Sequence, residues 1–477
     1  MSGFARILLG ATASHCGKTT ITCAILQALK NRGLQTVSFK CGPDYLDPLF
    51  HRQAIGVPSW NLDPFFTPAP VLNALFQEHA AGMDFSVIEG VMGYFDGLGG
   101  TSLAASTCEV ARITDTPAVL ILPCKGMSRS AVAMAKGYLE YARPNQLRGV
   151  ILNQLSPMLY PALRDQIETE LGVRVYGYFP PREEFVLPSR HLGLIPAHSL
   201  CDVCGFLEEL AKQAEESLDL DGLLVLGRTA PKPNAPPICL PDVQKHTEPP
   251  RIAVAQDDAF CFLYRDNLCL LEKLGAKLSF FSPLNDRTLP PCDGLILPGG
   301  YPELYAKALS QNNTMKQGIH DALQNGLPCL AECGGFLYLH ESLTDSDGHT
   351  FPMVGVIASR AYPCGHLKRF GYVRLTAQHS QLLCGKGERI PAHEFHYWES
   401  DAPGNAYLAV KPTSQRSWEC VHGTPTLYAG FPHLYFYANP RFAARFFNAC
   451  CQYHQQEESR DSHDLTVLSP QHFPSGS

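Results

Sequence analysis

Residues 327–340 read LPCLAECGGFLYLH, an apolar run that leads into Glu332, Cys333 and two glycines. The run predicts a buried strand, and the residues after the glycines predict the first turns of a helix. A strand that turns sharply into a helix holds the residue at the turn as an exposed nucleophile. Because Cys333 would stand at a helix N-terminus, we expect a lowered pKa and a thiolate. The alternative is a buried structural cysteine, since the chain contains 18 cysteines.

Two distant segments favour the nucleophile over the structural cysteine. Residues 293–303, DGLILPGGYPE, predict a strand that ends in a glycine pair, whose backbone N–H groups can point at a developing oxyanion. Residues 430–435, GFPHLY, place His433 after another apolar strand. A cysteine with a histidine far along the chain is the nucleophile-and-base arrangement of thiol acyl transfer.

The beginning of the chain has the pattern of a phosphate-binding loop. The segment GATASHCGKTT at 10–20 lies between a strand-like run and a helical pattern. In this context backbone N–H groups hold the phosphates, Lys18 pairs with them, and Thr19 offers a hydroxyl to Mg²⁺. The strict GxxxxGK[ST] spacing fails because Thr12 stands where the first glycine belongs. The alternative is an ordinary turn between strand and helix with a chance GKTT.

Two further strands are expected to end in acidic loops. The segment VSFKCGPDYLDP at 37–48 ends a strand at Lys40 and then presents two aspartates. The segment FSVIEGVMGYFDG at 85–97 ends a strand at Glu89. Carboxylates beside a phosphate loop suit Mg²⁺ binding or substrate positioning. We therefore expect Glu89 to bind Mg²⁺ and Asp96 to reach toward substrate or metal; the alternative for the aspartates is a solvated loop.

These segments resemble the cobyrinic acid a,c-diamide synthase family, in which a dethiobiotin synthetase-like ATP-binding domain is fused to a class I glutamine amidotransferase domain. The likeness is carried by KCGPDYLDP, EGVMGYFDG, AECGG and HEFHY, and it covers nearly the whole chain except the linker and the tail. It implies an α/β protein with two doubly wound domains. The expected organisation is an ATP- and substrate-binding amidoligase domain at 1–226, a Pro-rich linker at 227–250, a class I glutamine amidotransferase domain at 251–451 and a disordered tail at 452–477.

The resemblance also implies the roles of particular residues. Cys333 would attack the side-chain amide of glutamine, His433 would raise its nucleophilicity, and Gly300 and Gly334 would donate to the oxyanion. The remaining expected site residues are Gly17, Lys18, Thr19, Thr20 and Asn153 for ATP, with Asn153 at the nucleotide base; Thr19, Glu89 and Asp44 for Mg²⁺; and Lys40, Asp44, Tyr45, Asp47 and Asp96 for the substrate.

The implied reaction is ATP- and glutamine-dependent amidation of the a and c side-chain carboxylates of cobyrinate in cobalamin biosynthesis, through a phosphorylated carboxylate and ammonia. Alternatives within the same chemistry are amidation of another tetrapyrrole, such as hydrogenobyrinate or nickel-sirohydrochlorin, and cobyric acid synthase. A rival of another class is a P-loop ATPase whose degenerate amidotransferase domain only binds a partner. The sequence leaves the oligomeric state open, with a homodimer among the options.

One position departs from the pattern of many class I amidotransferases, which have a glutamate two residues after the histidine. That position is Tyr435 here. A neutral phenol carries no charge to stabilise an imidazolium, so we expect Cys333 and His433 to work as a pair without Tyr435. The identity of any third member stays open.

Composition excludes several other classes of protein. A net charge of −7 and a pI near 6.2 argue against general nucleic-acid binding. The sequence has no long apolar run and no signal-peptide pattern, so we expect no transmembrane helix and a cytoplasmic location with reduced thiols. Zinc is not expected at Cys201 and Cys204, which lack a second ligand pair, nor in HEFHY at 393–397, which lacks the HExxH spacing.

Overall fold

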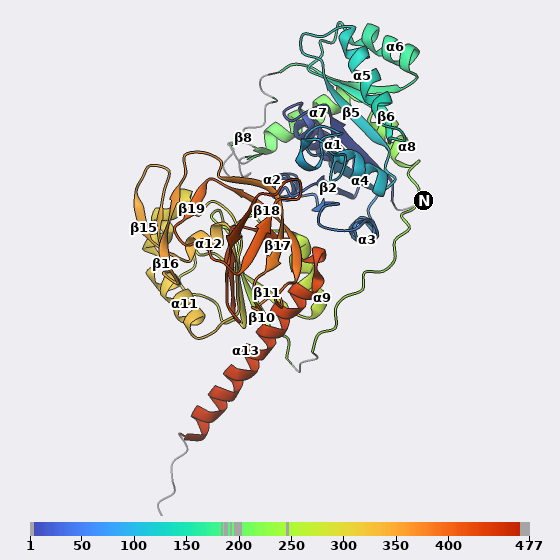
Figure 1. The fold of residues 1–477 in the computed structure, drawn as a ribbon. Coiled ribbons are helices and arrows are strands. Elements are labelled where there is room, and N and C mark those ends of the chain that lie inside the picture. The colour runs from blue at the N-terminus through green and yellow to red at the C-terminus, as the bar shows by residue number, and fades with distance from the viewer. Residues whose placement is uncertain are drawn as a thin grey trace, which may run out of the picture. The chain divides into compact units, whose positions relative to one another are not determined.

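The structure, a computed structural model, describes residues 4–182, 185, 189–190, 193–194, 203–244 and 248–467. The chain forms two compact units, Met1–Cys239 and Leu240–Ser477 (Figure 1). The division falls within the Pro-rich segment that follows helix α8 (Leu220–Gly227). The 17 cysteines among the described residues are all free, and Cys201 lies outside those residues.

The first unit is built on a parallel sheet of seven strands in the order β3-β2-β4-β1-β5-β6-β7. Alternate residues of the central strand enter two different apolar cores: Ile7 and Leu9 pack in one, and Leu8 in the other. Because both faces of the sheet are covered, its strands are nearly continuous apolar runs. The strands are β1 (Arg6–Ala11), β2 (Thr36–Cys41), β3 (Ser59–Leu62), β4 (Phe85–Glu89), β5 (Ala118–Pro123), β6 (Leu147–Asn153) and β7 (Arg174–Phe179).

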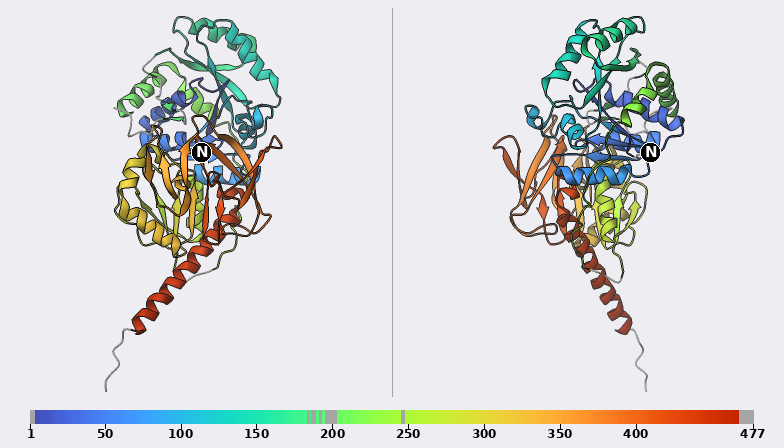
Figure 2. Two further views of the ribbon diagram at one scale, coloured as in Figure 1. Left: turned by 60° about the vertical axis from the view of Figure 1, so that its left-hand side comes forward. Right: turned by 90° about the vertical axis from the view of Figure 1, so that its right-hand side faces the viewer.

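Helices cover both faces of this sheet, as Figures 1 and 2 show. Residues of α1 and α7 belong to the core that contains Ile7, and residues of α3, α4, α5 and α6 belong to the core that contains Leu8. This is the doubly wound arrangement that the sequence predicted. The bounds are α1 (Lys18–Asn31), α3 (Ala69–Ala80), α4 (Thr107–Ile113), α5 (Ser130–Tyr141), α6 (Tyr160–Leu171) and α7 (Val203–Ser217).

The second unit contains a six-stranded sheet in the order β11-β10-β12-β13-β23-β22. Its first five strands are parallel, and β22 (His422–Gly423) runs antiparallel to β23. The other bounds are β10 (Arg251–Ala255), β11 (Lys277–Phe281), β12 (Gly294–Leu297), β13 (Cys329–Glu332), β23 (Leu427–Gly430), α9 (Arg265–Leu274), α10 (Ala306–Gln311), α11 (Asn313–Gln324) and α12 (Gly334–Tyr338).

Two smaller sheets complete this unit, and the sequence had not predicted them. One has the order β15-β14-β16-β19 and the other the order β21-β20-β17-β18-β24. The second is antiparallel throughout and ends in the short strand that carries His433. The bounds are β14 (His340–Thr344), β15 (Thr350–Pro352), β16 (Ile357–Pro363), β17 (Arg369–Ala377), β18 (Arg389–His396), β19 (Trp398–Ser400), β20 (Tyr407–Val410), β21 (Ser417–Cys420) and β24 (His433–Leu434).

The structure corrects the expectation of a disordered tail at 452–477 for residues 452–467 only. Helix α13 (Pro440–Val467) continues through residues 452–467, and its last turns extend away from the rest of the second unit (Figure 2). The polar composition that suggested disorder is compatible with an exposed helix, because such residues as Gln and Glu have high helix propensity. Residues 468–477 lie outside the described part of the chain. No helix in the described ranges is long and apolar enough to cross a membrane.

Candidate active sites

Cys333 stands at a strained turn between β13 and α12. Its backbone has φ 45° and ψ −99°, a left-handed conformation that is uncommon for a residue with a side chain. The N–H of Cys333 donates to the Gly430 carbonyl at 2.8 Å, which fixes the turn to the end of β23. Strain of this kind persists only where the surrounding structure imposes it, and it is frequent at functional sites. The strand–turn–helix that the sequence predicted is therefore present.

Glycines at this turn permit two backbone segments to approach closely. A Cβ atom on Gly334 would lie 2.8 Å from the Gly300 nitrogen, and one on Gly335 would lie 2.0 Å from the Leu297 carbonyl oxygen. A Cβ atom on Gly300 would likewise lie 2.0 Å from the Ala259 carbonyl oxygen. The two glycine turns foreseen in the sequence thus meet beside the cysteine, with the Gly300 and Gly334 backbones in contact.

His433 reaches the same place from the antiparallel sheet. It lies on β24, which pairs with β18 so that His433 stands opposite His393. Its imidazole packs on the backbone of Gly299, where an added Cβ would lie 2.5 Å from the His433 Cε1 atom. The side chain is buried. The structure therefore gathers His433, Gly300, Gly334 and Cys333 into one constellation.

Burial changes the expected chemistry of the thiol. Burial raises the pKa of Cys333 above its usual value, and the nearby Glu303 raises it further, whereas the Gly334 N–H opposes the rise. Burial also raises the pKa of Glu303, to about 7. The expectation of a thiolate at rest was therefore wrong. Helix α12 has only five residues, and its dipole does not outweigh the loss of water around the sulfur.

Glu332 is a site residue that the sequence analysis quoted but did not assign. Its Oε2 atom lies 3.4 Å from His433 Nδ1, and its Oε1 atom accepts a hydrogen bond from the Leu434 N–H at 3.0 Å. Tyr435 has a different partner, because its hydroxyl donates to Asp266 Oδ2 at 2.7 Å. The position next to the nucleophile was a possible signal, but pairing with a residue about 100 positions away is not visible in a local pattern.

Residues 393–396 of the HEFHY segment lie on β18 and include three buried polar side chains. Burial lowers the pKa values of His393 and His396 to about 3, so both imidazoles are neutral near pH 7. Burial raises the pKa of Glu394 to about 7, and this carboxyl accepts a hydrogen bond from Trp418 Nε1 at 3.3 Å. His396 stacks on Phe431 with ring centroids 3.8 Å apart.

In the first unit, the side chains of Asn153 and Lys18 contact the loop between β1 and α1. Gly17 has φ 84°, and an added Cβ would lie 2.2 Å from the Asn153 Nδ2 atom. Asn153 donates from Nδ2 to the Cys16 carbonyl at 2.9 Å, and its Oδ1 accepts from the Gln154 N–H at 3.0 Å. Asn153 thus supports the loop from β6. Its contact with a nucleotide base stays a prediction.

Lys18 is folded over the same loop. Its ammonium donates to the carbonyls of Met92 at 2.6 Å and Ala13 at 3.2 Å. Burial, with the nearby Lys40 ammonium, lowers the pKa of Lys18 to about 8. A cation in this position is suited to phosphate oxygens, which would replace the carbonyls as partners. Thr20 lies in the first turn of α1, two residues after Lys18.

The carboxylates foreseen near the loop form a cluster around Lys40. The β2–β4 register places Lys40 beside Glu89, and their side chains pair at 2.8 Å. Lys40 also pairs with Asp47 and lies 4.0 Å from Asp44. Thr19 donates from Oγ1 to Glu89 at 2.7 Å. The four oxygen-bearing side chains of Thr19, Asp44, Asp47 and Glu89 come from two helices, one loop and one strand. They form the kind of ligand set that Mg²⁺ prefers.

The pKa values of the acidic groups in this cluster are set by burial and by the Lys40 ammonium. Burial raises the pKa of Glu89 to about 7 and that of Asp44 to about 6. Burial acts in the same direction on Asp47, but Lys40 outweighs it and lowers the pKa of Asp47. Asp44 also accepts hydrogen bonds from the backbone N–H groups of Leu46 and Asp47. The cluster holds more acidic groups than one lysine balances, which favours a further cation.

The remaining predicted residues lie around this cluster in different ways. Tyr45 immediately precedes helix α2 (Leu46–Phe50). Asp96 is exposed and accepts a hydrogen bond from the Gly93 N–H at 2.9 Å, within its own loop. His51, which the sequence analysis missed, places Nε2 at 3.6 Å from Glu89 Oε2 and Nδ1 at 3.0 Å from the Ser38 hydroxyl. Burial lowers the pKa of His51 to about 4, so it is neutral behind Glu89.

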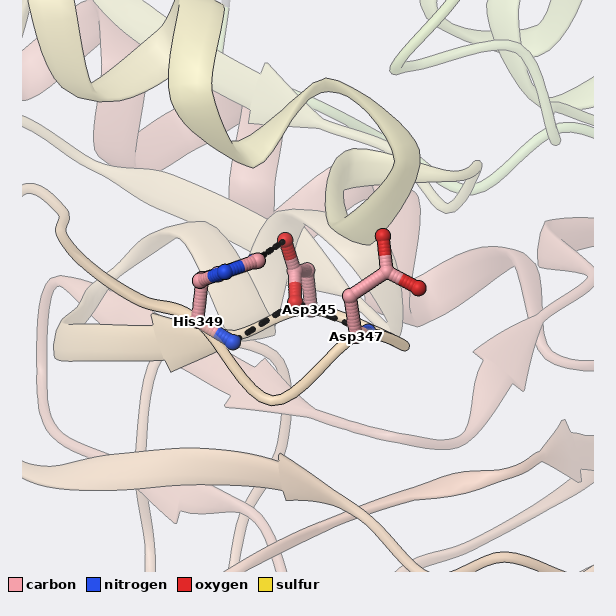
Figure 3. A group of neighbouring side chains, drawn as sticks. All are labelled: Asp345, Asp347 and His349. Carbon is pink, nitrogen blue, oxygen red and sulfur yellow. Dashed lines mark hydrogen bonds and ion pairs between the residues drawn. The ribbon is translucent and has the colours of Figure 1, made fainter.

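A third group of polar side chains lies at the turn between β14 and β15 (Figure 3). The ligand atoms of Asp345, Asp347 and His349 lie within 4.8 Å of one another. The backbone N–H groups of Asp347 and His349 both donate to Asp345 Oδ1, at 2.9 Å and 2.8 Å. These bonds explain why the three side chains lie together: they belong to a turn that the Asp345 carboxylate stabilises.

Comparison with known proteins identifies relatives of both units. A family model for a CobQ/CobB/MinD/ParA nucleotide binding domain matches residues 7–195, and one for a CobB/CobQ-like glutamine amidotransferase domain matches residues 251–440. A cobyrinate a,c-diamide synthase of Caldanaerobacter subterraneus subsp. tengcongensis is 37% identical over 94% of this chain and 98% of its own length. Synthases of the same name from Listeria monocytogenes and a Synechococcus strain are 37% and 38% identical, over 93% and 94% of this chain and 99% and 98% of their own lengths.

Proposed function

Because the chain belongs to the cobyrinate a,c-diamide synthase family, we propose that it amidates the a and c side-chain carboxylates of cobyrinate with ATP and glutamine. The observation that carries the proposal is the presence on one chain of two complementary constellations. One gathers Cys333 with His433, and the other gathers Lys18 with a carboxylate cluster. One suits release of ammonia and the other suits activation of a carboxylate.

In the second unit, His433 accepts the proton of the Cys333 thiol as the sulfur attacks the side-chain amide carbon of glutamine. The N–H groups of Gly300 and Gly334 donate to the oxyanion of the tetrahedral intermediate. Collapse expels ammonia, which takes the proton from His433, and leaves a glutamyl thioester. Water, deprotonated by His433, then hydrolyses the thioester to glutamate and restores the thiol.

In the first unit, the N–H groups of the loop at Gly17, with Lys18, Thr19 and Thr20, hold the ATP phosphates. A substrate carboxylate attacks the γ-phosphorus and forms an acyl phosphate and ADP; ammonia then attacks the acyl carbon, and phosphate leaves. Thr19, Glu89 and Asp44 would hold Mg²⁺, which neutralises charge on the phosphates when bound. Lys40, Tyr45, Asp47 and Asp96 position the substrate in this proposal, and Asn153 contacts the base. We also propose a cytoplasmic location, where ATP and glutamine are available.

The test is to incubate the chain with ATP, Mg²⁺, glutamine and one tetrapyrrole at a time, and to count added amides by mass spectrometry. We expect two amides on cobyrinate and none with the Lys18→Ala variant. Amides on hydrogenobyrinate or nickel-sirohydrochlorin alone would assign another substrate, and amides added only to a substrate already amidated at a and c would indicate a cobyric acid synthase. If no tetrapyrrole is amidated and glutamine is not hydrolysed, the P-loop ATPase with a partner-binding domain is the better description.

A further inference from the structure

His433, the proposed base of the thiol site, needs a charged partner. Two residues after it, where many class I amidotransferases have a glutamate, this chain has Tyr435. A histidine that accepts a thiol proton becomes an imidazolium, and a carboxylate at the other ring nitrogen fixes its tautomer and stabilises that charge. Tyr435 has its hydroxyl bonded to Asp266 and carries no negative charge at neutral pH. The partner must therefore come from elsewhere in the fold.

We propose that Glu332, the residue immediately before the nucleophile, is the positioning residue for His433. Its two carboxylate oxygens contact different groups of the short strand β24. Oε1 accepts from the Leu434 N–H at 3.0 Å, which anchors the carboxylate to β24, and Oε2 faces His433 Nδ1 at 3.4 Å. The inference rests on the proposed glutaminase role of this site.

The 3.4 Å separation is long for a hydrogen bond and within the range of an ion pair. Catalytic contacts of this kind commonly tighten only when substrate is bound. With Nδ1 protonated and directed at Glu332, the lone pair of the ring is on Nε2, which is then the atom that accepts the thiol proton. Because burial raises the pKa of the Cys333 thiol, the site depends on such a base.

Two titratable neighbours of His433, His393 and His396, carry no negative charge that could stabilise an imidazolium. His393 stands opposite it on β18, and His396 acts on it from the same strand; both have pKa values lowered by burial to about 3 and are neutral. Glu332 and His433 are 5% and 1% exposed, so water does not screen their interaction. The backbone supports the arrangement, because Glu332 stands opposite Gly430 in the β13–β23 pairing, three residues before His433.

The sharpest test compares Glu332→Gln with Glu332→Ala, because glutamine keeps an oxygen for the Leu434 N–H and removes only the charge. We expect both variants to lower kcat for glutamine hydrolysis on the order of 10²–10⁴-fold, with KM for glutamine changed by less than about threefold. Amidation driven by free ammonia should stay at the wild-type rate, which also shows that the variants are folded.

A second measurement follows the rate at which iodoacetamide alkylates Cys333, read at its peptide by mass spectrometry. We expect Glu332→Gln to slow alkylation by at least tenfold, because loss of the charged partner of the base outweighs removal of the Glu332 charge, which itself raises the pKa of Cys333. Glu332→Gln with wild-type kcat, alongside an impaired Glu332→Ala, would overturn the proposal and leave a backbone-anchoring role. Absence of glutamine hydrolysis in the wild-type protein would instead contradict the proposed function.

Discussion

At the scale of single residues, Cys333 defines the division of labour between the two sites. In the proposed reaction, its thiol generates ammonia and takes no part in activating the carboxylate. We therefore expect Cys333→Ser to abolish amidation with glutamine and to leave amidation with ammonium chloride at alkaline pH within about twofold of wild type. The two rates are compared in the same assay by counting amides. Loss of the ammonia-dependent rate in a variant with a wild-type circular dichroism spectrum would contradict this division.

Tyr435 provides the matched control for His433, because the two side chains lie two residues apart and both are buried. We expect His433→Ala to lower the glutaminase rate on the order of 10²–10⁴-fold and Tyr435→Phe to lower it less than about tenfold. Tyr435→Phe should act on stability instead, by about 1–3 kcal/mol, because the buried Asp266 carboxylate loses a donor. Steady-state kinetics and urea denaturation separate the two effects. Equal rate losses in the two variants would make Tyr435 a working member of the site.

Glu89 gives the first unit a pH-dependent stability. Burial raises the pKa of Glu89 to about 7, above its ordinary value of 4.5, so the folded protein holds this proton more tightly than the unfolded chain. The stability that Glu89 contributes is therefore complete below its ordinary pKa and is lost as the pH rises through about 7. We expect the free energy of unfolding of wild type, relative to Glu89→Gln, to fall between pH 5 and pH 8. A flat or rising difference, measured without nucleotide, would contradict this assignment.

At the scale of elements, glycine is required at the turn beside Cys333 because two backbone segments lie too close together for a Cβ atom. Gly318 has room for a Cβ atom and serves as the control. A Cβ on Gly335 would lie 2.0 Å from the Leu297 carbonyl oxygen, whereas one on Gly318 in α11 would have its nearest neighbour at 3.8 Å. We expect Gly335→Ala to destabilise the second unit by roughly 1–3 kcal/mol or more and Gly318→Ala to stabilise it by about 0.4–1 kcal/mol. Midpoints of urea denaturation followed by tryptophan fluorescence test both. A Gly335→Ala midpoint equal to that of wild type would show that the backbones can separate at no cost.

Elements could be predicted from the sequence where the determining pattern is local. An apolar run with glycine or polar residues at its end predicts each of four elements. These are the strand before Cys333, the helix after Lys18 and the strands that end at Lys40 and Glu89. The antiparallel sheet that carries His433 could not, because its strands pair across long stretches of chain, as β18 does with β24. The thiolate expectation at Cys333 failed for a related reason, since local sequence shows a helix start but not how much water the fold removes.

At the scale of the whole molecule, substitutions in the two units are expected to impair different steps of the reaction. Lys18→Ala and Glu89→Gln alter the site for phosphates and metal, so they should lose amidation by at least about 10²-fold with either glutamine or ammonia. The same variants should keep glutamine hydrolysis, because Cys333 and His433 are in the other unit. Assays with both nitrogen sources check this, with Cys333→Ser as the opposite case. Normal ATP-dependent turnover by either variant would show that the N-terminal loop has been misinterpreted.

The organisation into two chemical units was visible in the sequence because each unit carries its own contiguous motifs. The partnership between Glu332 and His433 was not, since it joins the ends of β13 and β24 across about 100 residues of intervening chain. The role of His51 behind Glu89 was hidden for the same reason, because an isolated histidine in a helix has no distinctive neighbours in sequence. Motifs thus predicted side chains that lie together in the fold, and the fold added neighbours from distant segments, Glu332 and His51.

The buried, protonated state of Cys333 has a consequence for how the protein withstands oxidants. Oxidation of cysteine to sulfenic acid begins from the thiolate, and its rate follows exposure of the sulfur. Cys333 is 6% exposed and has its pKa raised by burial, so the resting nucleophile offers peroxide neither the reactive form nor ready access. In the proposed mechanism, sensitivity to oxidative damage is then confined to the moments of turnover, when His433 accepts the proton.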